Sequence, residues 1–147
     1  MAEAADPAGP LLLEAVLDAL ETRLSESLRR DAAEIGLTEA TARVLLALGG
    51  TEGLTMRGLA SRIARDPSTV TRFVRRAADA GLVEQRAGEP DRRTRVLHLT
   101  KEGGAKRERL ARLRSTRAAA LRDGVCSRTG LGAEEVDWFL SAVLRAL

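Results

Sequence analysis

The sequence contains few of the residues that build cross-links, cofactor sites or membrane spans. Its 147 residues include one cysteine, one histidine, one tryptophan, two phenylalanines and no tyrosine. A lone cysteine cannot form a disulfide within the chain, which fits a reducing compartment, so a cytoplasmic protein is expected. No run of eighteen apolar residues is present, and no basic segment followed by an apolar one lies at the N-terminus. Neither a transmembrane helix nor a secretory signal is therefore expected.

The same scarcity argues against catalysis and metal binding. An enzyme would need an acid–base pair, an activated nucleophile or a phosphate-binding glycine loop, and none of these is apparent. We therefore predict that the protein is not an enzyme and carries no cofactor. Without other histidine or cysteine ligands a metal site is not expected, and His98 is interpreted as a half-exposed strand residue.

Positive charge is concentrated in the middle of the chain. Residues 57–122 carry 18 basic and 7 acidic side chains, a net charge of +11. Residues 1–56 carry 4 basic and 10 acidic ones, and residues 123–147 carry 2 and 4. A basic segment between acidic ones predicts that this part of the chain contacts a polyanion such as nucleic acid.

Two short helical patterns, separated by a tight turn, lie within this basic segment. Thr55 is placed to cap the first helix, which we expect to end near residue 64. Asp66 is placed to cap the second helix, 66–79, and Pro67 fits its first position, where no backbone N–H is needed. Gly81 is suited to end that helix in the left-handed conformation.

Two extended segments, 82–86 and 93–99, follow these helices. They are joined by the charged turn 87–92, so the stretch 82–99 reads as a β-hairpin wing. Residues 52–54 could add a short edge strand to it. Two helices followed by such a hairpin are typical of a winged helix-turn-helix, which we assign to residues 37–100.

The second helix has one apolar face and one polar face rich in hydroxyl and guanidinium groups. Hydroxyls suit phosphates and base edges, and arginine suits guanine edges and phosphates. An ordinary solvated helix face is the alternative interpretation. We predict base and nearby phosphate contacts from the leading residues and phosphate contacts from the later arginines. The leading residues are Ser68, Thr69, Thr71 and Arg72, and the later ones are Arg75 and Arg76.

Three short motifs in this region resemble the MarR family of bacterial transcription regulators. They are Ala80-Gly81-Leu82-Val83, Pro90-Asp91-Arg92-Arg93 and Leu99-Thr100 with Gly103. Each is weak alone, but their order and spacing together are specific. The motifs lie within residues 66–103, whereas the similarity in the order of elements covers nearly the whole chain.

The resemblance implies a mainly α fold with a small hairpin wing that touches DNA. Arg92 is the best candidate for insertion into the minor groove, because a narrow groove concentrates negative potential. Arg93 is included in the predicted DNA-binding set, and Asp91 is expected to shape the turn.

Apolar helical stripes lie at both ends of the chain. Residues 1–9 are expected to be disordered, and the first helix runs from about Pro10 to Ile35. A long helix is expected from Lys101 to Asp123, ended or kinked by Gly124, with a loop and a last helix after it. We assign 10–36 and 101–147 to a dimerisation region, because a small domain cannot bury both apolar faces alone. The resemblance implies the same homodimer; a monomer with its terminal helices folded back is the alternative.

A two-fold dimer would place two recognition helices about 34 Å apart, one turn of double-stranded DNA. The expected target is therefore a pseudo-palindromic operator, and the protein would associate with the nucleoid through it. The resemblance implies a repressor released by a small-molecule effector, or in some members by cysteine oxidation, although Cys126 is more simply an incidental thiol. The alternative function is a winged-helix interaction module without DNA binding, which would not need a cationic helix face.

Overall fold

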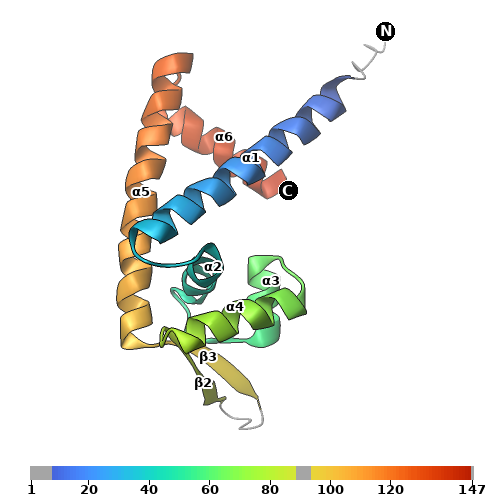
Figure 1. Cartoon of the computed structure of the whole chain (residues 1–147). Helices are drawn as coiled ribbons and strands as arrows, with labels where there is room; N and C mark the ends of the chain where they lie inside the picture. The colour runs from blue at the N-terminus through green and yellow to red at the C-terminus, as the bar shows by residue number, and fades with distance from the viewer. Residues whose placement is uncertain (1–7, 89–93, 147) are drawn as a thin grey trace. The chain divides into compact units, whose positions relative to one another are not determined.

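The computed structural model describes residues 8–88 and 94–146, which are mostly helical with three short strands. This arrangement confirms the expected mainly α fold with a small sheet (Figure 1). None of the described helices is long and apolar enough to cross a membrane. The elements are α1 (Ala8–Glu34), α2 (Glu39–Leu48), β1 (Leu54–Thr55), α3 (Met56–Ile63), α4 (Pro67–Asp79), β2 (Val83–Ala87), β3 (Arg95–Leu99), α5 (Lys101–Thr129) and α6 (Ala133–Ala146).

The chain divides into two compact units, the first ending at Leu110 and the second beginning at Ala111. The first unit contains α1 to α4, the sheet and the start of α5, and the second contains the rest of α5 and α6. The assignment of residues 37–100 to DNA binding and of the flanking helices to dimerisation stays a prediction.

Helices α2, α3 and α4 each begin where a side chain caps the first turn. Thr38 Oγ1 accepts a hydrogen bond from Thr41 N at 3.2 Å, and Thr55 Oγ1 accepts one from Gly58 N at 3.1 Å. Asp66 caps α4, with Pro67 at its first position, as the sequence predicts. The chain leaves α4 through Gly81, whose φ of +70° is the left-handed conformation expected there.

The core of the first unit lies where α2, α3 and α4 meet the sheet. Its side chains are aliphatic, and burial of each contributes roughly 1.5–3 kcal/mol relative to exposure. The largest fully buried members include Leu45, Leu48, Leu59, Val70 and Leu97. This core fixes the orientation of α4, because the buried side of that helix is anchored in it.

The sheet is antiparallel, with strand order β1-β3-β2. Leu54 pairs with Leu97 and Val83 pairs with Leu99, so β3 is the central strand. The short edge strand expected near residue 54 is therefore present. The hairpin formed by β2 and β3 projects beyond the helices of its unit (Figure 1).

Helix α5 begins against the backbone that follows α4. Thr100 Oγ1 donates to the carbonyl of Gly81 at 2.8 Å and accepts from Gly103 N at 3.0 Å. A Cβ at Gly103 would lie 2.9 Å from the carbonyl carbon of Leu82, and nearer still to its oxygen. Only a glycine fits this approach, which gives a physical reason for the Leu-Thr and glycine motif.

The start of α1 and the end of α5 differ from the sequence prediction. Helix α1 is described from Ala8, so Ala8 and Gly9, expected to be disordered, are helical; Pro10 is tolerated in this first turn because the N–H it lacks would have no helical partner. The rest of the segment expected to be disordered, residues 1–7, lies outside the described residues. Helix α5 continues through Gly124, because an interior glycine costs about 1 kcal/mol relative to alanine without removing a backbone bond. The helix ends at Thr129, where Gly130 has φ +74°, so the loop expected from Arg128 is shorter.

Both terminal helices expose apolar side chains. On α1, Leu28 and Ala32 are buried, whereas Leu20 and Leu24 are 50% and 57% exposed. In the second unit Arg122 donates to Asp137 at 3.3 Å, joining α5 to α6. The large exposed apolar residues of this unit include Leu121, Leu131, Trp138 and Phe139.

Candidate nucleic-acid interface

Helix α4 carries the predicted site on its solvent face. Val70, Val74 and Ala77 are buried on one side of the helix, which leaves the polar side outward. Thr69 is half-buried. The other predicted residues of this helix are exposed, namely Ser68, Thr71, Arg72, Arg75 and Arg76. The structure therefore gathers the α4 part of the predicted set on one accessible surface.

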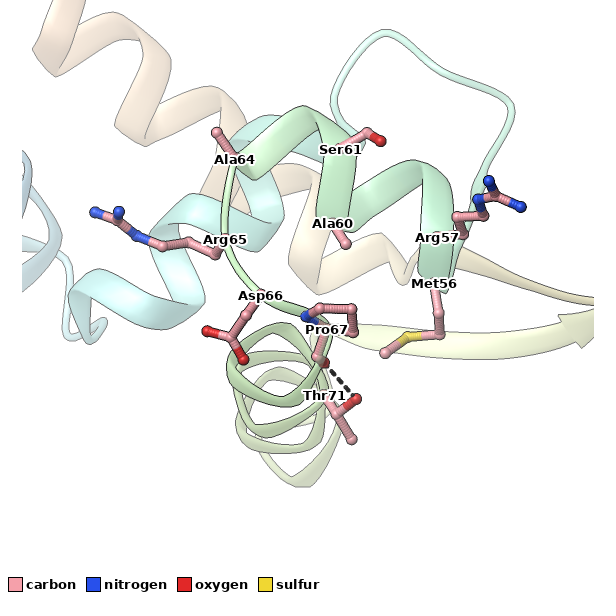
Figure 2. Close-up of a pocket in the computed structure, with 9 residues that line it drawn as sticks. All are labelled: Met56, Arg57, Ala60, Ser61, Ala64, Arg65, Asp66, Pro67 and Thr71. Atoms are coloured by element: carbon pink, nitrogen blue, oxygen red, sulfur yellow. Dashed lines mark hydrogen bonds between the residues drawn. The ribbon is translucent and has the colours of Figure 1, made fainter.

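The two exposed hydroxyls at the start of α4 donate their protons within the chain. Ser68 Oγ donates to Asp66 Oδ1 at 2.6 Å. Thr71 Oγ1 donates to the carbonyl of Pro67 at 2.8 Å, the bond drawn in Figure 2. The Ser68 hydroxyl and the bonds from Thr69 hold the pKa of the Asp66 carboxyl well below its usual range. The sequence suggested hydroxyls as contacts but did not reveal that their protons are already used.

The arginines of α4 are held only weakly by their neighbours. Arg72 Nη2 lies 3.5 Å from Thr69 Oγ1, and Arg75 Nε lies 4.0 Å from Asp79 Oδ2. The Arg75 side chain is 84% exposed. Exposed pairs of this kind contribute at most about 1 kcal/mol. These guanidinium groups can therefore turn toward an external anion at little cost.

A groove of about 560 Å³ lies between α3 and α4, next to the leading end of α4. Figure 2 shows Arg57 and Ser61 on the α3 side, with Pro67 and Thr71 on the α4 side. Arg65, in the turn, pairs with Glu21 at 3.6 Å. Arg57 and Ser61 are exposed one helical turn apart, and neither belongs to the predicted DNA-binding set. Their i, i+4 spacing on α3 is the feature of the sequence that could have identified them.

The wing is described only in its strands. Arg86 on β2 forms an ion pair with Glu84, and Arg95 on β3 is exposed. Arg92 and Arg93, predicted to contact DNA, lie outside the described residues, as does Asp91, so their roles stay predictions. His98 is half-buried on β3, as predicted.

Cys126 is a partly buried thiol in the last part of α5. It lies within the helix, and its carbonyl accepts a hydrogen bond from Gly130 N at 2.9 Å. This position belongs to the second compact unit, whereas α4 belongs to the first.

Residues 35–94 match the family model described as "MarR family". The HTH-type transcriptional regulator PetP of Rhodobacter capsulatus is 37% identical over 68 residues. That alignment covers 46% of this chain and 41% of PetP, so the chain spans about two-fifths of the length of this curated relative.

Solved structures share the fold over nearly the whole chain. The crystal structure of a MarR family transcription regulator has a TM-score of 0.77 at 20% identity, covering 93% of this chain and 88% of its own. The transcriptional repressor CouR, bound to a 23-mer DNA duplex, has a TM-score of 0.74 at 25% identity, covering 97% and 99%. The winged helix-turn-helix of this chain therefore matches the MarR family model, and the chain as a whole shares the fold of these solved structures.

Proposed function

We propose that this protein is a sequence-specific regulator of transcription that binds double-stranded DNA with α4 in the major groove. The observation that carries the proposal is the exposed face of α4, where hydroxyls lead and weakly held arginines follow. This face lies in the segment of net charge +11. A major groove admits an α-helix, and neutralising phosphates with arginine supplies much of the binding free energy. CouR, 25% identical with the same fold, was solved with a DNA duplex, which supports the proposal.

The contacts divide by position along the helix. Arg72, one turn from the leading end, is proposed to reach a base, and Arg75 and Arg76 to hold phosphates. Arg57 on α3 is added to the phosphate contacts because it is exposed beside the same groove. Arg92 in the wing is proposed to enter the neighbouring minor groove, and Arg93 is proposed as a further contact to DNA.

The active form is proposed to be a homodimer. Trp138 and Phe139 are 68% and 58% exposed on α6, and Leu24 is 57% exposed on α1. Large apolar side chains on the surface favour an interface in which a second copy of the chain covers them. A two-fold pair of α4 helices would then bind half-sites about 34 Å apart in a pseudo-palindrome.

Regulation is proposed to follow from a small-molecule effector that releases the protein, a repressor, from its operator. Such a molecule acts only if it binds one spacing of the two recognition helices better than the other. The protein is proposed to act in the cytoplasm, at the nucleoid.

The test compares Arg72→Ala with Arg30→Ala, an exposed arginine on α1 in the acidic segment. Binding to a duplex selected from a random pool and to unselected DNA is measured by fluorescence anisotropy at two salt concentrations. If Arg72 reads a base, its loss lowers the discrimination between the two DNAs by about 1–3 kcal/mol, while Arg30→Ala changes nothing.

Equal losses on both DNAs would make Arg72 a phosphate contact. Failure of the wild-type protein to bind any duplex at low salt would refute DNA binding itself.

A further inference from the structure

The leading end of α4 presents oxygen atoms without a proton to donate. Ser68 Oγ donates to Asp66 Oδ1 at 2.6 Å, and Thr69 N donates to the same oxygen at 2.9 Å. Both of these bonds end on Oδ1, and the Thr69 side chain also donates to the carboxylate, so the nearby hydroxyl protons are directed at Asp66. Asp66 and Ser68 are both exposed. What they offer to a partner is therefore a carboxylate oxygen and the lone pairs of a hydroxyl, which can only accept hydrogen bonds.

The leading end of α4 is poorly suited to binding a phosphate. The hydrogen bonds that cap the helix favour the ionised form of Asp66, so the pKa of its carboxyl is lowered and the group is negative at neutral pH. A phosphate brought next to Asp66 would meet a like charge. Ser68 could donate to a phosphate only by giving up its charge-assisted bond to Asp66.

A base edge in the major groove is the complementary partner. Guanine presents the acceptors O6 and N7 there, and thymine presents the acceptor O4. Cytosine N4 and adenine N6 are amino groups that donate. The first residues of a recognition helix are the ones that contact base edges.

Resting on the proposed function, we propose that Asp66 and Ser68 select a cytosine or adenine amino group at one position of each half-site. A guanine or thymine edge at that position would place acceptor against acceptor, with no proton between them. Asp66 thus contributes to specificity partly by excluding guanine and thymine. The arginines further along α4 supply the attraction to DNA.

The competing role for Asp66 is that of a helix cap alone. Asparagine and serine cap helices about as well as aspartate. Asp66→Asn therefore keeps the cap but replaces one carboxylate oxygen with an NH2 donor and removes the charge. Asp66→Ser is a second variant of the same kind. Asp79→Asn is the matched control, because Asp79 is an exposed carboxylate at the far end of the same helix.

The experiment selects bound sequences from random duplexes with the full-length wild-type protein and these three variants, and thermal unfolding checks the fold. The wild type is expected to enrich cytosine or adenine at one position of each half-site. Both Asp66 variants should weaken that preference roughly tenfold without changing the other positions. Asp79→Asn should leave every preference unchanged.

A second arm needs no variant to fold. The selected duplex is remade with 2-pyrimidinone for the cytosine, or purine for the adenine, so that only the amino group is lost. Wild-type affinity should fall roughly tenfold. Unchanged preferences in the Asp66 variants, or unchanged affinity for the analogue, would overturn the inference. A wild-type protein that enriches no sequence at all would instead refute the proposed function.

Discussion

Replacing Gly103 with alanine should separate the start of α5 from the Leu82 backbone, which lies just before β2. The added Cβ would lie 2.9 Å from the carbonyl carbon of Leu82 and 3.3 Å from its Cα. Carbon atoms in contact are ordinarily about 3.5–4.0 Å apart, so the two backbones must move by at least about 0.6 Å. The obstacle is backbone, which no change of rotamer removes. The neighbouring Gly104 has nothing within 4 Å of its added Cβ, so the same substitution there meets open space.

The magnitude follows from three contributions. Overpacking a close contact costs about 1–3 kcal/mol. The hydrogen bond from Thr100 N to the Leu82 carbonyl, 3.1 Å long, contributes about 0.5–1.5 kcal/mol and is weakened by the displacement. Alanine has a higher helix propensity than glycine, which offsets about 0.8–1.0 kcal/mol of the destabilisation. Gly103→Ala should therefore lower the free energy of unfolding by about 1–3 kcal/mol, whereas Gly104→Ala should raise it by about 0.5–1 kcal/mol.

Urea and thermal unfolding, followed by circular dichroism at one protein concentration, measure both variants. The concentration is fixed because unfolding of a dimer depends on it. At about 4 °C per kcal/mol, the midpoints of the two variants should differ by roughly 6–16 °C. Equal stabilities for Gly103→Ala and Gly104→Ala would refute the steric reasoning and the docking of α5 on Leu82.

Two further predictions concern the recognition helix and the last helix. Ser68→Ala should raise the pKa of the Asp66 carboxyl, because it removes the largest cause of its lowering. A lowered carboxyl pKa contributes stability that is lost as pH falls from the unfolded value to the folded value, so in the variant this loss should be smaller and should be complete at a higher pH. An NMR titration measures the shift, and Thr71→Ala, whose hydroxyl bonds Pro67 instead, should leave it unchanged. Phe139→Asp should raise the dimer dissociation constant by roughly 30-fold or more in analytical ultracentrifugation, whereas Ser141→Asp should not. A Phe139→Asp protein that stays as dimeric as the wild type would remove α6 from the proposed interface.

Local signals in the sequence were sufficient to predict where α3 and α4 begin. Thr38, Thr55 and Asp66 each cap a helix by accepting a hydrogen bond from the backbone N–H three residues later. Each interaction therefore depends on only four consecutive residues. The polar face of α4 follows in the same way from helical periodicity, since its apolar residues anchor the other side in the core.

Interactions between distant segments could not be predicted in this way. The residues around Gly103 in the sequence do not indicate that the Leu82 backbone lies against it. Likewise, the residues around Lys106 do not indicate its 3.0 Å hydrogen bond to the Ile35 carbonyl. Asp31 on α1 is 1% exposed although its residue type is usually at the surface. The end of α5 was misplaced because a glycine both terminates helices and is tolerated inside them, and only the surrounding chain decides between these outcomes.

The strand order of the sheet has a consequence for the order of events during synthesis. The strand β3 lies in the middle of the sheet but is the last of the three to leave the ribosome. Until residues 95–99 emerge, β1 and β2 lack their partner, because in the described part of the chain each of them pairs with β3. A nascent chain can therefore form the helices α1 to α4 early, but it gains its whole sheet in a single late step.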